Sequence, residues 1–271
     1  MSMNLLEGKR GIITGALDEN SIAWKTALKA KEQGAKFVLT NAPIAMRMGA
    51  IQDLAKECDT IVVPADATSV EDIEKLYAEA KEFLGGNFDF ILHSIGMSPN
   101  VRKGREYGDL NYDWVQKSWD VSALSFHKMM QVAEKQDVMN EWGSIIGLSY
   151  IAAQRVYPFY SDMAEAKAIL ESIARSYGYR FGKLKNVRVN TISQSPTKTT
   201  AGTGIGGFDA FYNYAEALSP LGNAPSEACA DYIIAMFSDL TRYVNMQNLF
   251  HDGGYSCTGI TEAIVDKFSD K

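Results

Sequence analysis

The chain has 271 residues, of which 46% are hydrophobic and 22% are charged, a balance typical of an ordinary globular protein rather than a fibrous or disordered one. Its formal net charge of -6 and its pI near 5.2 argue against binding to nucleic acid or anionic lipid, because no segment supplies the clustered Lys and Arg that such binding needs. The expected partners are small molecules or proteins.

Cysteine and histidine are too scattered to predict a disulfide framework or a metal site. Cys58, Cys229 and Cys257 are odd in number and form no CxxC pair, and the three histidines lack HxxxH or HExxH spacing. We therefore expect no metal and a reducing, cytoplasmic compartment. The N-terminus lacks the apolar run of a signal peptide, and no stretch approaches the ~20 apolar residues of a membrane span, so we expect neither.

Short β-branched runs alternate with longer amphipathic segments along the whole chain, which is typical of an α/β protein. Most runs are continuously apolar, as expected for parallel strands covered by helices on both faces. The predicted strands are 10–14, 36–40, 60–64, 88–94, 143–149, 187–193 and 247–251. The first helix is predicted to begin near Ser21 and to close at Gly34, a C′ glycine. We predict one domain, residues 1–271, with a doubly wound, Rossmann-like parallel sheet and helices on both faces.

A long segment after the sixth predicted strand, residues 194–217, departs from this pattern. Its glycines and threonines indicate a mobile backbone, whereas Phe208, Phe211, Tyr212 and Tyr214 supply apolar surface. In an open α/β sheet, a long insertion after the C-terminal end of a strand lies where ligands bind. We predict a substrate-binding loop here. The alternative is a disordered surface loop, in which so many aromatic residues would be unusual.

The turn after the first strand has features that a pyrophosphate needs. Gly15 allows close approach of the backbone, and Ser21 opens a helix whose free N–H groups and dipole attract a phosphate. The match to GxGxxG is poor, and an ordinary N-cap serine is the alternative. Asp18 and Glu19 would disfavour a phosphate unless they point to solvent.

Two later strands end in further signals for a dinucleotide. Asp66 lies just past the third predicted strand, where its carboxylate can accept a hydrogen bond from an adenine amino group; a turn or capping aspartate is the alternative. Gly96 ends the fourth strand and lets the backbone approach a ribose or a nicotinamide. Each signal is modest, but their order along the chain is informative.

Several motifs together resemble the bacterial enoyl-acyl carrier protein reductases of the short-chain dehydrogenase/reductase superfamily, and the resemblance covers essentially the whole chain. These motifs are Gly15-x5-Ser21-Ile22-Ala23, HSIGMSP (93–99), WDVSALSF (119–126), LSYIAAQRVYPFYSDMAEAK (148–167), VRVNTIS (187–193) and FHDGGYS (250–256). The most specific element is Tyr150, Tyr160 and Lys167 in one segment. The resemblance implies reduction of the trans-2 double bond of enoyl thioesters by hydride transfer from NADH in fatty acid elongation, acyl carrier protein as partner, and a homotetramer.

The resemblance also implies a role for each matching residue. Tyr160 would stabilise the enolate at the thioester oxygen, Lys167 would hold the nicotinamide ribose, and Tyr150 would line the acyl site and assist. The implied cofactor-binding residues are Gly15, Ser21, Ile22, Asp66, Ala67, Ile95, Gly96, Lys167, Thr197 and Thr199. The implied substrate-binding residues are Met97, Ser98, Tyr150, Met163 and Phe208. Core packing with a satisfied hydroxyl is the alternative for any one tyrosine, and we expect it for Tyr157.

The spacing of seven between Tyr160 and Lys167 separates this chain from most members of that superfamily, which place the lysine four residues after the tyrosine and a serine thirteen before it. Here those two positions are Ala164 and Gly147. On one helix, Tyr160 and Lys167 would share a face and stand about 10 Å apart along the axis. The longer reach suits conjugate reduction, because charge develops on the thioester oxygen, away from the carbon that receives the hydride.

Two other features of the sequence bear on this resemblance. A literal Tyr-x3-Lys does occur, at Tyr179 and Lys183, but it lies at the far end of the helix, and we expect both to be surface residues. Residues 193–196 read Ser-Gln-Ser-Pro where the family often has Ser-Ala-Gly-Pro. Because that glycine would lie near the nicotinamide, the sequence does not predict the conformation of this loop.

The end of the second strand predicts a preference for NADH over NADPH. Thr40, Asn41 and Ala42 are neutral, so they can accept a ribose hydroxyl but offer no cation to a 2′-phosphate. Only Arg47 could supply one, and we expect Met46, Arg47 and Met48 to begin the next helix, with the Arg47 side chain solvated. Two alternatives to the enoyl reductase stay open: a reductase of ketones or 3-oxoacyl thioesters, and a regulatory protein that binds a dinucleotide without turnover.

Overall fold

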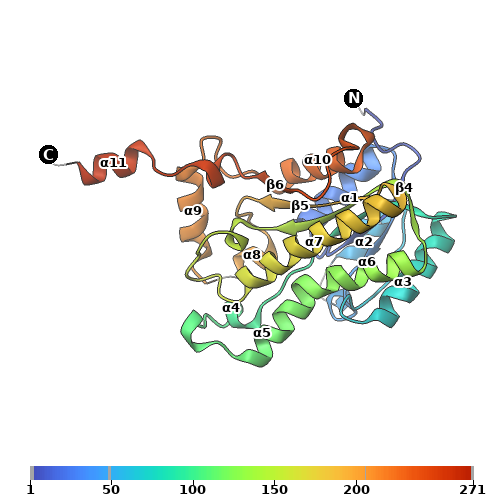
Figure 1. Ribbon diagram of the computed structural model, residues 1–271, viewed down its shortest axis with the longest axis horizontal. Helices are drawn as coiled ribbons and strands as arrows, with labels where there is room; N and C mark the ends of the chain where they lie inside the picture. Colours follow the sequence, from blue (N-terminus) through green and yellow to red (C-terminus); the bar gives the residue numbers. More distant parts are fainter. Residues whose placement is uncertain (1–2, 48–49, 205, 270–271) are drawn as a thin grey trace.

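The computed structural model describes residues 3–47, 50–204 and 206–269, and its centre is one parallel sheet (Figure 1). The strands are β1 (Arg10–Thr14), β2 (Lys36–Thr40), β3 (Phe88–His93), β4 (Met139–Ser149), β5 (Arg188–Gln194) and β6 (Asn248–His251). They lie in the order β2-β1-β3-β4-β5-β6, and every neighbouring pair is parallel. The order changes direction between β1 and β3, the point at which such sheets bind ligands.

Helices cover both faces of this sheet. They are α1 (Ile22–Glu32), α2 (Ile51–Glu57), α3 (Val70–Leu84), α4 (Pro99–Arg102), α5 (Tyr112–Trp119), α6 (Ser125–Lys135), α7 (Met163–Lys185), α8 (Thr200–Thr203), α9 (Phe208–Leu218), α10 (Ser226–Phe237) and α11 (Glu262–Phe268). One buried cluster packs α3, α6 and α7 on one face, and a second packs α1, α2 and α10 on the other (Figure 1). The predicted doubly wound parallel sheet is therefore confirmed.

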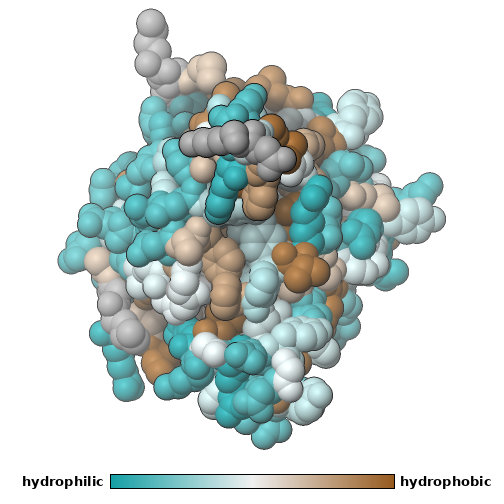
Figure 2. Space-filling model, turned by 90° about the vertical axis from the view of Figure 1, so that its left-hand side faces the viewer, coloured by the Kyte–Doolittle hydropathy of each residue, from teal (hydrophilic) through white to brown (hydrophobic). Residues whose placement is uncertain are grey.

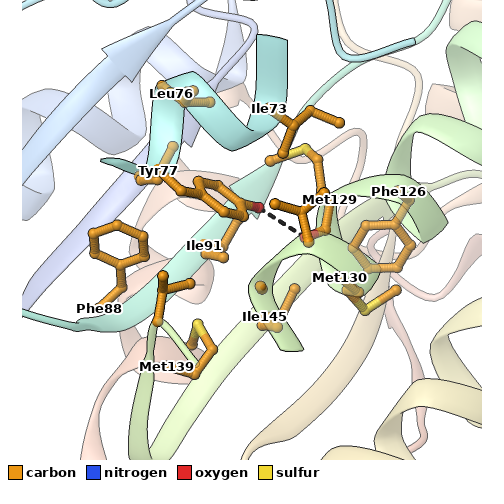
Figure 3. Close-up of a cluster of buried hydrophobic side chains, with 14 of the residues drawn as sticks. Ile73, Leu76, Tyr77, Phe88, Ile91, Phe126, Met129, Met130, Met139 and Ile145 are labelled. Carbon is orange, nitrogen blue, oxygen red and sulfur yellow. Dashed lines mark hydrogen bonds between the residues drawn. The ribbon is translucent and has the colours of Figure 1, made fainter. Parts of the chain in front are cut away.

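The α3 and α6 layer shows how this core is fixed. The ring of Tyr77 packs edge-on against Phe88, with 5.7 Å between ring centroids. Its hydroxyl donates a hydrogen bond of 3.0 Å to the carbonyl oxygen of Met129, so the buried polar atom has a partner (Figure 3). This contact joins β3, α3 and α6.

The start and end predicted for the first helix are confirmed. The Ser21 side chain accepts a hydrogen bond from the backbone N–H of Trp24, so it is the N-cap of α1. Gly34 has a φ of +89° and follows the C-cap residue. The backbone N–H groups of Gly34 and Ala35 donate to the carbonyl oxygens of Lys31 and Ala30, which is the Schellman pattern.

The strand predicted at 60–64 is wrong. This segment forms only an isolated parallel bridge, between Val62 and Leu39 of the edge strand β2. Backbone hydrogen bonds link Leu39 to Ile61 and Val63 and link Asn41 to Ala65, but this pairing is too sparse to form a strand. The segment therefore lies beside the sheet without becoming a full strand.

Residues 194–217 are more regular than the sequence indicates, because they include α8 and most of α9. Gly207 has a φ of +75° and leads directly into α9, whose first residue, Phe208, is buried. The chain ends beyond this region in α11, which projects from the body (Figure 1) and buries none of its side chains. The face that carries α9 and α11 mixes hydrophobic and hydrophilic residues (Figure 2).

Within the described ranges, no helix is long and apolar enough to cross a membrane. In the same ranges, no group of His, Cys, Asp and Glu side chains is arranged to hold a metal ion.

Candidate active site

The C-terminal ends of the parallel strands bring the predicted site segments to one edge of the sheet. Gly15 follows β1 and donates its N–H to the carbonyl oxygen of Thr40, at the end of β2. Ser94 follows β3 and donates its N–H to the hydroxyl of Thr14, at 3.0 Å. Tyr150 follows β4 directly. Segments separated by more than a hundred residues therefore meet here.

Lys167 lies in α7, and its ammonium group is buried at this edge. The ammonium donates a hydrogen bond of 2.7 Å to the carbonyl oxygen of Leu148 in β4. Burial lowers the pKa of Lys167 from 10.5 to about 8, and the nearby Glu171 carboxylate acts in the opposite direction. Lys167 is therefore a cation at neutral pH, and two of its three N–H donors have no partner among the described residues.

Gly96 lies against this lysine. A Cβ atom added to Gly96 would stand 3.6 Å from the Lys167 Nζ atom and 2.9 Å from the Met163 methyl group. A side chain at this position would therefore crowd the lysine. The structure thus brings together three of the predicted residues, Gly96 from the segment after β3 and Met163 and Lys167 from α7.

Tyr160 is not on the helix that carries Lys167, so the prediction of a shared helical face is wrong. Residues 158–162 form a turn, and α7 begins only at Met163. The carbonyl oxygen of Tyr160 accepts the N–H of Met163, and Ser161 between them has a φ of +44°. A residue in this left-handed region cannot continue a right-handed helix. The spacing of seven therefore consists of a turn followed by the first helical turn.

The hydroxyl of Tyr160 is available to a ligand. The side chain is partly buried and packs against Met163, and its hydroxyl has no hydrogen-bond partner among the described residues. Burial raises the pKa of Tyr160 above its ordinary value of 10. The phenol therefore keeps its proton and can act as a hydrogen-bond donor.

Tyr150 and Tyr157 complete an aromatic cluster around Tyr160. The Tyr150 ring lies 5.1 Å from that of Tyr160 and 5.3 Å from that of Tyr157, measured between centroids. Burial raises the pKa of Tyr150. The hydroxyl of Tyr157 bonds to that of Tyr255, and its ring packs 6.0 Å from that of Phe211 in α9. Tyr157 is thus a packed tyrosine with a satisfied hydroxyl, as expected.

Two members of this cluster were missed in the sequence. Tyr255 lies in the quoted motif FHDGGYS but has no predicted role, and Phe211 is predicted only to supply apolar surface within 194–217. Phe208, which was predicted to bind the substrate, packs instead beside Tyr212, with 6.0 Å between ring centroids. In the described contacts, α9 therefore reaches the tyrosine cluster through Phe211 and Tyr214 rather than Phe208.

The predicted acyl-site residues after β3 are held by internal hydrogen bonds. The backbone of Met97 exchanges hydrogen bonds with the hydroxyl of Ser122, at 2.9 and 3.1 Å. The hydroxyl of Ser98 donates to the carboxylate of Asp162 at 2.6 Å and accepts from the N–H of Val101 at 3.0 Å. Ser98 is only 4% exposed, so its hydroxyl serves the fold in this structure.

The glycine of the first turn is required by geometry. Gly15 has a φ of +83°, and a Cβ atom added to it would stand 2.0 Å from the carbonyl oxygen of Ser94. The turn after β1 therefore packs directly on the segment after β3. Ser21 donates to the carbonyl oxygen of Asp18 at 2.7 Å, while the Asp18 carboxylate accepts from Thr200 of α8 at 2.5 Å. This carboxylate is thus tied to residues 194–217.

The remaining predicted cofactor residues are placed as follows. Asp66 is exposed, and its carboxylate accepts two hydrogen bonds from Thr68, which is the turn aspartate given as the alternative. Thr197 donates to the carbonyl oxygen of Ser195, and Thr199 caps α8. Ile22, Ala67 and Ile95 are each partly buried. The contacts of Asp66, Thr197 and Thr199 are all made within the protein.

Gln194 and Ser195 fix the loop in which the family often has a glycine. The Gln194 side chain donates to the carbonyl oxygen of Ala224 at 2.9 Å and bonds to the His251 ring nitrogen Nδ1 at 2.7 Å. The Ser195 hydroxyl accepts the N–H of Ala224 at 3.0 Å. Both residues therefore tie β5 to β6 and to the start of α10 at Ser226.

The edge of the sheet fits a polar ligand. Among the described residues, several buried side-chain atoms lack a hydrogen-bond partner, and three of them are Thr40 Oγ1, His93 Nδ1 and Ser193 Oγ, at or next to the ends of β2, β3 and β5. Buried polar atoms are normally paired. Together with the free donors of Lys167 and the bare backbone at Gly96, they suit a ligand rich in hydroxyl and amide groups, such as a dinucleotide.

Arg47 ends a short 3₁₀ turn, Ala45–Arg47, and its side chain is exposed. The next helix, α2, begins only at Ile51, so the prediction that Arg47 begins a helix is wrong. Met48, also predicted to begin that helix, lies outside the described residues. The solvated side chain expected for Arg47 agrees with the structure.

A doubly wound parallel sheet with a tyrosine and a buried lysine at its C-terminal edge defines a dinucleotide-binding fold. The family model described as enoyl-(acyl carrier protein) reductase matches residues 15–256, so the chain belongs to this family. It is 36% identical over 267 residues to the enoyl-[acyl-carrier-protein] reductase [NADH] FabI of Rickettsia bellii, which covers 97% of this chain and 100% of that protein. The resemblance seen in the sequence is confirmed.

Solved structures of enoyl-acyl carrier protein reductases have the same fold as this chain. The FabI-NADH complex from Alistipes finegoldii is 62% identical, with a TM-score of 0.94 over 95% of this chain and 91% of that one. The Bacillus cereus enoyl-acyl carrier protein reductase, solved with NADP+ and indole naphthyridinone, is 30% identical, with a TM-score of 0.88 over 96% of this chain and 100% of that one.

Proposed function

We propose that this protein is an NADH-dependent enoyl-acyl carrier protein reductase, which reduces the trans-2 double bond of enoyl thioesters in fatty acid elongation. The observation that carries the proposal is the unpartnered, protonated hydroxyl of Tyr160, held outside α7 and seven residues before the buried cation Lys167. The family to which the chain belongs supports the same reaction.

The residues of the chain divide the chemistry between them. NADH, when bound, supplies the hydride that reaches the β-carbon of the substrate. Tyr160 donates a hydrogen bond to the thioester oxygen, where negative charge develops, and stabilises the enolate. Lys167 uses its two free donors to hold the ribose hydroxyls beside Gly96, and its charge adds to the field that stabilises the enolate. Tyr150, packed on Tyr160, lines the acyl site.

The chain is expected to oxidise NADH with crotonyl thioester and to leave acetoacetyl thioester largely unused. The physical reason is that Tyr160 is poised for the oxygen of a conjugated thioester, and Gly147 stands where a ketone reductase of the superfamily has its serine. Initial rates at 340 nm with both substrates measure the preference. Reduction of acetoacetyl thioester with crotonyl thioester untouched would favour the 3-oxoacyl reductase, and NADH binding without either reaction would favour the regulatory protein.

NADH is expected to support faster initial rates than NADPH at equal, subsaturating concentrations. In the structure, Thr40 and Asn41 offer only neutral groups at the end of β2, so a dianionic 2′-phosphate would lose water without gaining a cation. The exposed Arg47 is the cationic residue of the described segment 40–47 and could reverse this. Rates that favour NADPH would contradict the prediction, and loss of that preference in Arg47→Ala, but not in Lys36→Ala at the other end of β2, would identify Arg47 as the phosphate ligand.

The finer parts of this assignment rest on the resemblance. We propose one reductase domain over residues 1–271, with 194–217 as its substrate-binding segment and the matching residues named above as its site. We also propose acyl carrier protein as the carrier of the substrate, a cytoplasmic location, and a homotetramer, which the mass of the particle in solution would test.

A further inference from the structure

A buried carboxylate joins the two segments that form the candidate active site. Asp162 is 1% exposed and lies two residues after Tyr160. One carboxylate oxygen accepts the hydroxyl of Ser98 at 2.6 Å, and the other accepts the side-chain amide of Asn100 at 3.1 Å. Asp162 thus connects the turn before α7 to the start of α4, across 62 to 64 residues of sequence.

The donors on the α4 side are themselves fixed. The Ser98 hydroxyl caps α4 by accepting the N–H of Val101, and the Asn100 side chain exchanges two hydrogen bonds of 3.1 Å with the backbone of Asn111. Asp162 is therefore held by groups with little freedom to move. The Asp162 side chain does not cap its own helix: Asp162 is the N-cap residue of α7, but its carboxylate makes no cap hydrogen bond.

Burying a carboxylate costs free energy, so an aspartate at position 162 needs a structural or functional reason. Among the described residues, Asp162 has no ion pair, and hydrogen bonds from Ser98 and Asn100 compensate its burial. The N-terminus of the 23-residue helix α7 also favours a negative charge. An apolar residue would avoid the cost altogether, but it could not fix the distance between the two segments.

The turn next to Asp162 carries Tyr160 and is the part of the site whose position is least constrained by regular structure. Tyr160 lies outside α7, and Ser161, between Tyr160 and Asp162, has a φ of +44° and a buried hydroxyl without a described partner. The intrahelical ladder that holds Lys167 therefore does not hold Tyr160. The Tyr160 ring packs against Met163 and Tyr150, but no hydrogen bond from the described residues fixes its hydroxyl, and the turn that carries it passes through a residue in the left-handed region.

We propose that Asp162 is a positioning residue for Tyr160: its hydrogen bonds to Ser98 and Asn100 hold the turn so that the Tyr160 hydroxyl meets the thioester oxygen. This inference rests on the proposed enoyl reductase function. A displacement of about 1 Å at a reacting group can cost about 100-fold in rate. Asp162 acts through Tyr160 and does not touch the substrate itself.

Asp162→Asn is the test, because it keeps the shape of the side chain but replaces one acceptor with a donor. We expect kcat for crotonyl thioester to fall by roughly 10-fold, which is smaller than the about 100-fold loss for a full displacement of the reacting group. The affinity for NADH, measured by equilibrium titration, should stay within about 2-fold, because Lys167 is held by β4 and α7. In a Tyr160→Phe background the same substitution should change kcat by less than about 2-fold, since no hydroxyl remains to be positioned.

A purely structural role gives a different result: the losses from Asp162→Asn and Tyr160→Phe would then multiply. That outcome, or an unchanged kcat in Asp162→Asn alone, would overturn the proposal. If Asp162→Asn does not fold, Ser98→Ala removes one of the two hydrogen bonds, and the same lack of additivity with Tyr160→Phe is expected. If Ser98 instead acts on the substrate, its effect will persist in the Tyr160→Phe background, which also contradicts the proposal.

A matched control links α7 to the segment that follows α4. Tyr107 donates a hydrogen bond of 2.6 Å to Glu165 of α7, but this contact is exposed and lies after the helix has begun. Tyr107→Phe should leave kcat unchanged. If the unmodified protein does not reduce crotonyl thioester, the proposed function fails. If that protein is active but the losses in kcat from Asp162→Asn and Tyr160→Phe multiply, only the positioning role fails.

Discussion

Lys167→Ala is expected to weaken NADH binding and turnover together, whereas Tyr160→Phe should lower turnover and leave NADH affinity nearly unchanged. The structure separates the two residues. Lys167 is buried on β4 beside Gly96, with two donors free for the ribose, and Tyr160 lies in the preceding turn with its hydroxyl free. Removing a preorganised donor to a developing oxyanion costs about 100-fold in kcat, an upper guide for Tyr160→Phe because Tyr150 or water can take its place.

Equilibrium titration with NADH and steady-state rates with crotonyl thioester measure both effects. Tyr179 and Lys183, the literal Tyr-x3-Lys of the chain, provide matched controls, since both are exposed near the far end of α7. Tyr179→Phe and Lys183→Ala should behave like the unmodified protein. Normal NADH binding by Lys167→Ala would refute its assignment to the cofactor, and a large loss in Lys183→Ala would mean that the wrong pair had been chosen.

Most of the fold could be predicted, because buried parallel strands leave a plain signal. The runs RGIIT and KFVLT are almost fully apolar, and both became strands with the predicted bounds. The run 60–64 has a similar composition but stands at the edge of the sheet, where β2 is its one neighbour among the described strands and it forms a single bridge. Composition reports that a segment is apolar, and it does not report how many neighbours that segment has.

The placement of Tyr160 has no clear signal in the sequence. Pro158 restricts only the residue before it, Tyr157, and proline is tolerated in the first turn of a helix, so a helix that begins at Pro158 and includes Tyr160 is compatible with the sequence. Helical periodicity in the residues after Met163 is strong, and it was extended too far toward the N-terminus. The left-handed conformation of Ser161 has no signal in its residue type, since serine rarely adopts it.

The contacts that tie the site together could not be predicted from a single sequence. Asp162 and Ser98 are 64 residues apart, and Gln194 and His251 are 57 apart. Each pair meets because two different strands end at the same edge of the sheet, and no periodicity along the chain relates their positions. The motif at 193–196 gave a useful hint, because Gln194 and Ser195, which stand where the family often has alanine and glycine, form hydrogen bonds with Ala224.

The activity of the protein is expected to fall as the pH rises above about 8. Burial lowers the pKa of Lys167 from 10.5 to about 8, so the cation that holds the ribose is lost above this pH. The profile of kcat/KM for NADH reports groups of the free enzyme, and it should fall about tenfold for each pH unit beyond the pKa. Tyr160 cannot cause this limb, because burial raises its pKa rather than lowering it.

Stability responds to the same lysine in the opposite sense. Between pH 8 and 10.5, the unfolded chain holds a proton on Lys167 that the folded protein has lost. The free energy of unfolding therefore gains a contribution from this group as the pH rises through that window. A loss of activity at pH 9 without unfolding, checked by circular dichroism, is the expected result.

Glu171→Gln should move the falling limb to lower pH. Glu171 lies one helical turn after Lys167, is 5% exposed, and accepts hydrogen bonds from Ser149 and Gln154. Its charge raises the pKa of Lys167 against the effect of burial, so a neutral glutamine of the same shape removes that support. Glu165→Gln provides the control, because residue 165 lies on the opposite side of α7 from Lys167. If the limb stays in place in Glu171→Gln, or moves equally in both variants, Glu171 is not the group that keeps Lys167 charged.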